Sequence, residues 1–162
     1  MRKLYIMILT VIVSVVFCAC GGGIDPITKN ISFKAHISYY DKTYICPTVI
    51  TGDGSVLSEI ESPEVLSGMR FIYSDGKSAV EYKGMRYDFS GNNEFYAITD
   101  KICRVLRDCA ECKIPKSRDN FTLNGETGGE KYSIVFSPSG LPLSMQIGIA
   151  KIEFQDITIN LP

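Results

Sequence analysis

The stretch MRFIYSDGKSAVEY, residues 69–82, decides the fold of this chain. Two runs of alternating side chains flank the dipeptide Asp75–Gly76. Period-two alternation is typical of a strand with one buried face, and Asp-Gly favours the two-residue turn of a hairpin. The stretch therefore predicts two antiparallel strands joined by a tight turn.

The same alternation recurs along most of the chain. In ISFKAHISYY, residues 31–40, apolar side chains occupy every second position from Ile31 to Tyr39. Pro47 marks a sheet edge or a bulge. Changes in the apolar phase predict a turn near Gly148 and a bulge near Asp156. Further strands are predicted in TYICPTVIT (43–51), SVLSEIE (55–61), MRYDFS (85–90), FTLNGE (121–126), EKYSIVFS (130–137), LSMQI (143–147) and KIEFQDITIN (151–160).

One amphipathic helix interrupts the strands, and Pro115 lies past its end. Its apolar residues recur at helical spacing and predict a buried stripe that packs on the sheet. The expected fold class is α+β, mainly β: a curved antiparallel sheet of about nine strands, with one main helix on its concave face. The stripe comprises Phe95, Ile98, Ile102, Val105, Leu106 and Cys109.

The N-terminus has the pattern of an export signal. A basic start is followed by an uncharged run over residues 4–17, which is too short to span a bilayer and suits a signal h-region. Ala19–Cys20 then resembles the lipobox of bacterial lipoproteins, so we expect Cys20 to be lipidated and Cys18 to be removed. The expected organisation is a signal peptide over 1–19, a lipidated cysteine and flexible tether over 20–30, and a domain over 31–162.

Charge argues against nucleic acid as a partner. Removal of Arg2 and Lys3 with the signal leaves 15 basic against 18 acidic residues, a formal charge of −3. This is no basic footprint for a polyanion. The expected location is extracytoplasmic and membrane-anchored, on the outer membrane in a Gram-negative host.

Two longer stretches resemble the LolA/LolB-like half-barrel superfamily of lipoprotein carriers, which includes Firmicute GerS-like lipoproteins. They are SPEVLSGMRFIYSDGKSAVEYKGMRYDF (62–89) and GEKYSIVFSPSGLPLSMQI (129–147). The resemblance implies a half-barrel domain. The chain departs from the carriers in lacking a long helix before the first strand, the element that would cover a lipid.

The concave face of such a half-barrel either binds an apolar ligand or is filled by the helix. We therefore carry two hypotheses: a lipid or other amphiphile bound in an apolar cavity, or an envelope interaction module with a filled core. An open apolar cavity would favour the first and a closed interior the second. The candidate ligand-binding residues are Phe33, Ile37, Phe71, Tyr73, Tyr87, Phe89, Phe136, Met145 and Phe154.

The remaining cysteines are disulfide candidates, because an exported protein can form such bonds. Cys46 could pair with Cys103, Cys109 or Cys112, or Cys109 could pair with Cys112. A redox role for the CAEC motif is disfavoured, because a helix C-terminus disfavours the thiolate. We expect no metal site, no cofactor and no enzymatic activity: His36 is the single histidine, and the motifs GDG and TGG are turn material.

Overall fold

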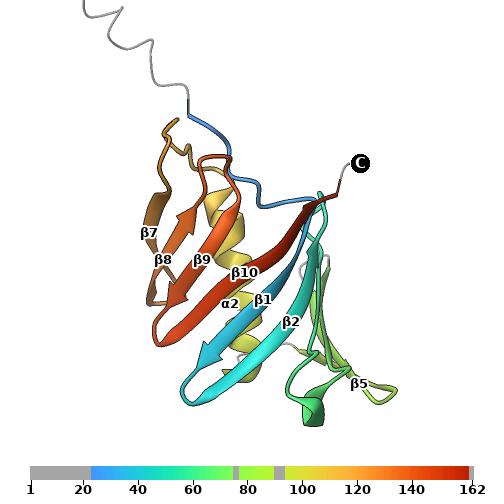
Figure 1. The fold of residues 1–162 in the computed structure, drawn as a ribbon. Coiled ribbons are helices and arrows are strands. Elements are labelled where there is room, and N and C mark those ends of the chain that lie inside the picture. Colours follow the sequence, from blue (N-terminus) through green and yellow to red (C-terminus); the bar gives the residue numbers. More distant parts are fainter. Residues whose placement is uncertain (1–22, 75–76, 90–93, 161–162) are drawn as a thin grey trace, which may run out of the picture.

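The computed structural model describes residues 23–74, 77–89 and 94–160. Within them, one ten-stranded antiparallel sheet curves around a single long helix, α2 (Figure 1). The predicted class, α+β and mainly β, is confirmed, and the strands number ten rather than about nine. The elements are β1 Ile31–Tyr39, β2 Lys42–Ile50, β3 Val56–Glu59, the 3-10 turn η1 Glu64–Leu66, β4 Arg70–Ser74, β5 Lys77–Tyr82, β6 Met85–Phe89, α2 Glu94–Cys109, β7 Phe121–Thr127, β8 Glu130–Phe136, β9 Pro142–Ile147 and β10 Ala150–Ile159.

The sheet consists of two meanders joined at its centre. Its strand order is β6-β5-β4-β3-β2-β1-β10-β9-β8-β7. Consecutive strands pair within each meander, β6 and β7 do not pair, and β1 pairs with β10 where the two meanders meet. This pairing places the first and last strands side by side and leaves β6 and β7 as the two edges.

The central strand β1 shows how alternation becomes a core. Ile31, Phe33, Ala35 and Ile37 are buried, and the residues between them are half-buried. Successive side chains of a strand point to opposite faces, so these four face the same side. Phe33 packs edge-on against Phe154 of β10, with 5.0 Å between ring centroids.

Helix α2 packs on the concave face with the predicted stripe. Ile102, Val105, Leu106 and Cys109 are almost fully buried, whereas Arg104 is exposed. Burial of a large aliphatic side chain contributes about 1.5–3 kcal/mol. The helix and the sheet thus bury each other's apolar faces, and the side chain of Phe95 lies outside the described residues.

The predicted turn and bulge near the C-terminus are both confirmed. Gly148 has a φ of 54° in the connection where Ile147 of β9 pairs with Ala150 of β10. Between β1 and β10 the register shifts by one residue between Ser32 and Lys34, opposite Asp156, which has a φ of 51°. The extra residue explains the phase change in the sequence.

The strand pairing of the hairpin predicted over residues 69–82 is also confirmed. Ser74 of β4 pairs with Lys77 of β5, which leaves two residues for the connection. Those two, Asp75 and Gly76, lie outside the described residues.

The expectation of a sheet edge at Pro47 is wrong, because β2 lies inside the sheet. Pairing of β2 with β3 covers residues 48–50, so Pro47 stands where that pairing stops.

A second correction concerns the expected flexible tether over residues 20–30. The segment 23–28, here called the strap, is attached to the domain. Ile24 exchanges two backbone hydrogen bonds with Ile114, of 2.7 and 2.9 Å, and the Ile27 amide donates to the Gly140 carbonyl at 2.8 Å. Pro26 and Thr28 are buried. The ordered domain therefore begins at the strap rather than at residue 31.

Cys20 and the predicted signal peptide lie outside the described residues. Among the described helices, none has the length and apolarity needed to cross a membrane.

Candidate functional site

Most of the predicted ligand-binding residues form the hydrophobic core. They lie on five strands and belong to one buried cluster with the apolar stripe of α2. Where α2 meets β3 and β4, the remaining space is about 10 Å³. A site of this size holds at most one water molecule. The concave face is therefore filled where α2 meets β3 and β4. The buried candidates are Phe33, Ile37, Phe71, Phe136, Met145 and Phe154.

The other three candidates lie toward the β6 edge, at or beyond the cover of the helix. Tyr73 is half-buried: Arg107 of α2 donates to its hydroxyl at 2.9 Å, and the guanidinium carbon lies 4.7 Å from the ring centroid. Tyr87 is 66% exposed, so its predicted place in an enclosed apolar face is wrong. The side chain of Phe89 lies outside the described residues.

An open groove lies at the end of the half-barrel where the β1–β2 and β9–β10 hairpins turn. Its volume is about 440 Å³. In Figure 1 these hairpin turns lie at the lower end of the sheet, beside the start of α2. We call this the hairpin-end groove. It is lined by Tyr39, Tyr40, Ile98, Lys101, Glu130, Ile147, Gly148, Ile149 and Ala150.

Apolar groups at this groove are unusually exposed. Tyr40 is 78% and Ile149 54% exposed, and each belongs to a hairpin turn. The rings of Tyr39 and Tyr40 pack edge-on with centroids 4.7 Å apart. Tyr40 adopts a φ of 54°, a conformation that is uncommon for a residue with a side chain. Sequence alternation missed the groove because a turn residue belongs to neither face of a strand.

One ion pair supplies the polar part of the groove. Lys101 of α2 binds Glu130 of β8 at 2.7 Å between Nζ and Oε1. Gly148 leaves room for this carboxylate, since a Cβ there would lie 3.2 Å from Oε2 of Glu130. The groove thus combines aromatic and aliphatic walls with one partly exposed pair of opposite charges.

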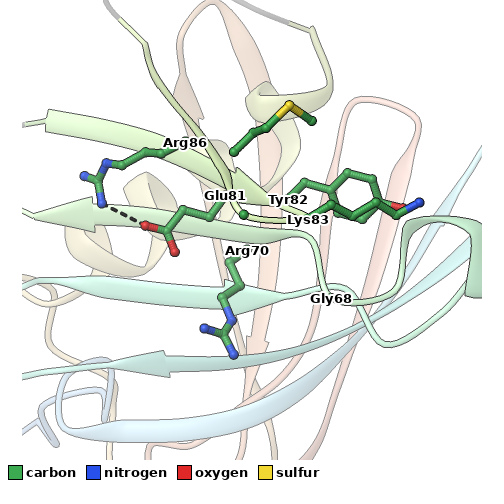
Figure 2. Close-up of a pocket in the computed structure, with 8 residues that line it drawn as sticks. Gly68, Arg70, Glu81, Tyr82, Lys83 and Arg86 are labelled. Carbon is green, nitrogen blue, oxygen red and sulfur yellow. Dashed lines mark hydrogen bonds and ion pairs between the residues drawn. The ribbon is translucent and has the colours of Figure 1, made fainter.

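A second groove of about 360 Å³ lies around the β5–β6 turn (Figure 2). Its two arginines have carboxylate partners: Arg86 binds Glu81 at 2.9 Å and Arg70 binds Glu59 at 2.7 Å. Lys83 lies 5.0 Å from the centroid of the Tyr82 ring. Both arginines are neutralised within the chain, and the charged walls of this groove disfavour an apolar ligand.

The convex face carries a row of apolar residues across four strands. Val49 pairs with Leu57, Leu57 with Ile72, and Ile72 with Ala79. They alternate with residues that face α2, so the row lies on the opposite side of the sheet. Val49 is 38% and Leu57 44% exposed. We call these four residues the convex row.

The four cysteines that the structure describes are free thiols, so the expected disulfide does not form in it. Burial raises the pKa of Cys46, Cys103 and Cys109 to about 12. Cys112 is half-buried, and its Sγ donates weakly to the Asp108 carbonyl at 3.6 Å. Thiols this strongly protonated are poor nucleophiles and poor metal ligands.

The described residues contain no group of three or more His, Cys, Asp or Glu side chains that could hold a metal ion.

Comparison with known proteins finds similarity to solved structures. No protein-family model matches the chain, and no protein of curated description matches its sequence. Among solved structures, the chain is similar to the crystal structure of a LolA superfamily protein from Nitrosomonas europaea, with 10% identity and a TM-score of 0.44. The match covers 86% of this chain and 90% of that one. The half-barrel assignment itself rests on the sheet order and on the position of α2.

Proposed function

We propose that the chain is a membrane-anchored extracytoplasmic lipoprotein that binds a lipid or other amphiphile in the hairpin-end groove, without catalysis. The observation that carries the proposal is the groove itself: an open site of about 440 Å³ with exposed Tyr40 and Ile149 in its walls. Small-molecule sites typically have volumes of about 300–1,000 Å³ and mostly apolar walls. The filled interior moves the expected ligand site from the concave cavity to this end.

The chemistry of the groove favours a ligand with one apolar chain and a polar end. An acyl chain would cover Tyr40 and Ile149, which water now contacts, and removal of this apolar surface from water would drive binding. The Lys101–Glu130 pair would lie next to the polar end of the ligand. Because the pair is 2.7 Å apart and partly exposed, it offers both a donor and an acceptor without an unpaired buried charge.

The proposed location is inferred from the N-terminal sequence. The signal pattern and Ala19–Cys20 support lipidation of Cys20, with palmitate-like acyl chains as the anchor. Two or three such chains hold a protein stably on a membrane, since each buried methylene contributes about 0.8 kcal/mol.

The test is ligand binding by residues 23–162, which retain the strap. The probe is lysophosphatidylcholine, a single-chain amphiphile, and the readout is native mass spectrometry. Ile149→Glu should weaken binding by about tenfold, or 1.4 kcal/mol, because it places a charge in the apolar wall. The matched control is Leu57→Glu, at a residue of similar exposure on the convex face. Equal affinity of the two variants would contradict a ligand site in this groove.

The alternative, an envelope interaction module without a ligand, is favoured by two observations. The space between α2 and strands β3 and β4 is only about 10 Å³, and the convex row exposes Val49 and Leu57. A photo-crosslinking residue at position 57 that joins one envelope protein, with position 149 giving no such product, would support this alternative. Absence of amphiphile binding by the unmodified domain would be required as well.

A further inference from the structure

We propose that the strap end of the half-barrel is held at the surface of the bilayer that carries the Cys20 anchor, and that the hairpin-end groove faces away from it. The inference rests on the lipidation proposed above. It goes beyond that proposal by assigning an interaction surface, whose partner is the anchoring membrane itself.

The strap is attached to the domain by hydrogen bonds. Its two backbone hydrogen bonds with Ile114 and its hydrogen bond to Gly140 connect it to two separate segments. Lys113 also forms an ion pair with Asp25. Gly140 has a φ of 85°, and a Cβ there would lie 3.0 Å from the Asp25 carbonyl oxygen, so the strap packs closely on this turn.

Only a short length of chain separates the anchor from the strap. Four residue steps separate Cys20 from Ile24. A fully extended chain spans at most about 3.3–3.6 Å per residue, so the tether reaches about 14 Å. Ile24 therefore cannot move far from the headgroups while its hydrogen bonds persist.

The groove and the strap lie at opposite ends of the half-barrel. In Figure 1 the strap (blue), the segment after α2 and the β8–β9 turn lie at the upper end, and the β1–β2 and β9–β10 turns lie at the lower end. Strand β1 alone has nine residues, a length of about 30 Å. The tether is about half as long, so the domain cannot invert and place its groove end first on the membrane.

The strap end also has suitable surface chemistry. The exposed residues 115–120, PKSRDN, are all polar or charged apart from Pro115. Lys116 and Arg118 outnumber Asp119, so this stretch does not repel phosphate-bearing headgroups. The opposite end exposes Tyr40 and Ile149, and the short tether keeps these residues away from the anchoring leaflet.

A functional consequence follows for the groove. An amphiphile that enters it arrives from the side facing away from the anchoring membrane, by transfer from another protein or from a facing surface. In this orientation the groove does not contact the anchoring leaflet, so the amphiphile does not enter laterally from that leaflet.

The experiment uses the full lipidated chain in phosphatidylcholine–phosphatidylglycerol vesicles that contain a lipid with a nitroxide on its headgroup. The chain has no Trp, so one introduced Trp is an unambiguous reporter. Lys116→Trp and Lys42→Trp are matched substitutions at exposed lysines, the first at the strap end and the second at the start of β2 beside the β1–β2 turn. We expect the nitroxide to quench K116W and leave K42W close to its emission without quencher. Equal quenching, as in a domain lying flat, or stronger quenching of K42W would overturn the proposal.

A linker variant tests whether the short tether is the cause. Insertion of 20 Gly/Ser residues between Gly22 and Gly23 raises the root-mean-square reach by about 25 Å. We expect the difference between the two Trp reporters to disappear, and its persistence would overturn the role of the tether. If the wild-type chain fails to sediment with vesicles, as Cys20→Ala should, the anchor proposal fails. Vesicle-bound protein with equal quenching overturns the orientation alone.

Discussion

At the scale of single residues, the cysteines show how burial determines chemistry. Cys46, Cys103 and Cys109 are buried thiols, each with a pKa raised to about 12 by desolvation. Cys109 also has the Tyr132 hydroxyl as a hydrogen-bond partner, and this contact opposes the rise in its pKa. The expected exported location made these residues disulfide candidates, but the sequence carries no direct information about which thiols are buried.

Thiol reactivity should therefore differ between positions. In the native domain over residues 23–162, we expect Cys112 to react with Ellman's reagent first, because it is half-buried and the other three are buried. The remaining thiols should react after denaturation. The Cys112→Ser variant is the control and should lose the fast phase. A fast phase that survives in this variant would contradict the burial of the other three.

At the scale of elements, α2 and the sheet depend on each other. Leu106→Ala should lower the free energy of unfolding by about 2–5 kcal/mol, because it removes a side chain that is 1% exposed. Arg104→Ala on the same helix removes an i,i+4 ion pair with Asp100, and because the arginine is half-exposed the cost should stay at about 1 kcal/mol or less. Urea unfolding measures both, and similar costs for the two variants would contradict the packing of α2.

The strap is the second element whose attachment can be tested. Gly140→Ala places a Cβ against the Asp25 carbonyl and forces a left-handed conformation, at a cost of roughly 1–2 kcal/mol for the conformation alone. Hydrogen exchange of the Ile27 amide, which bonds to Gly140, should become faster. Gly128→Ala is the matched control, since it shares the positive φ but has open space around it. Faster exchange of Ile27 in both variants would show that the strap responds to stability in general.

At the scale of the whole molecule, the buried thiols make stability depend on pH. In the folded state the thiols of Cys46 and Cys103 have a pKa of about 12, whereas thiols in the unfolded chain have a pKa of about 8.5. Above that pH the unfolded chain binds fewer protons than the folded one, so the free energy of unfolding falls as pH rises. Below it, this contribution is fully present.

Urea midpoints measured from pH 8 to pH 11 test this expectation. The midpoint of the wild-type domain should fall over this range. The Cys46→Ala/Cys103→Ala double variant, although less stable, should show a shallower fall. Parallel curves for the two proteins would show that other groups control the alkaline transition.

The strands could be predicted from the sequence more closely than the candidate site could. Alternation in residues 31–37 predicted the buried face of β1, and the phase changes located the Gly148 turn and the Asp156 bulge, because both follow from the two-residue period of a strand. The same period placed Tyr87 on the helix-facing side, yet it is 66% exposed. A ten-stranded sheet is about 45 Å across at 4.7–4.9 Å per strand, and a helix about 10–12 Å wide covers part of it.

The sequence by itself determined which residues form strands, which face of each strand is apolar, and that one helix supplies the complementary apolar stripe. These properties follow from local periodicity and turn chemistry. The tertiary structure alone decided that the interior is filled, that β2 is central, that the strap is bonded to Ile114 and Gly140, and that a groove lies beside Tyr40 and Ile149. These properties depend on contacts between segments far apart in the chain, such as β1 with β10 and residue 24 with residue 114, and no local pattern encodes them.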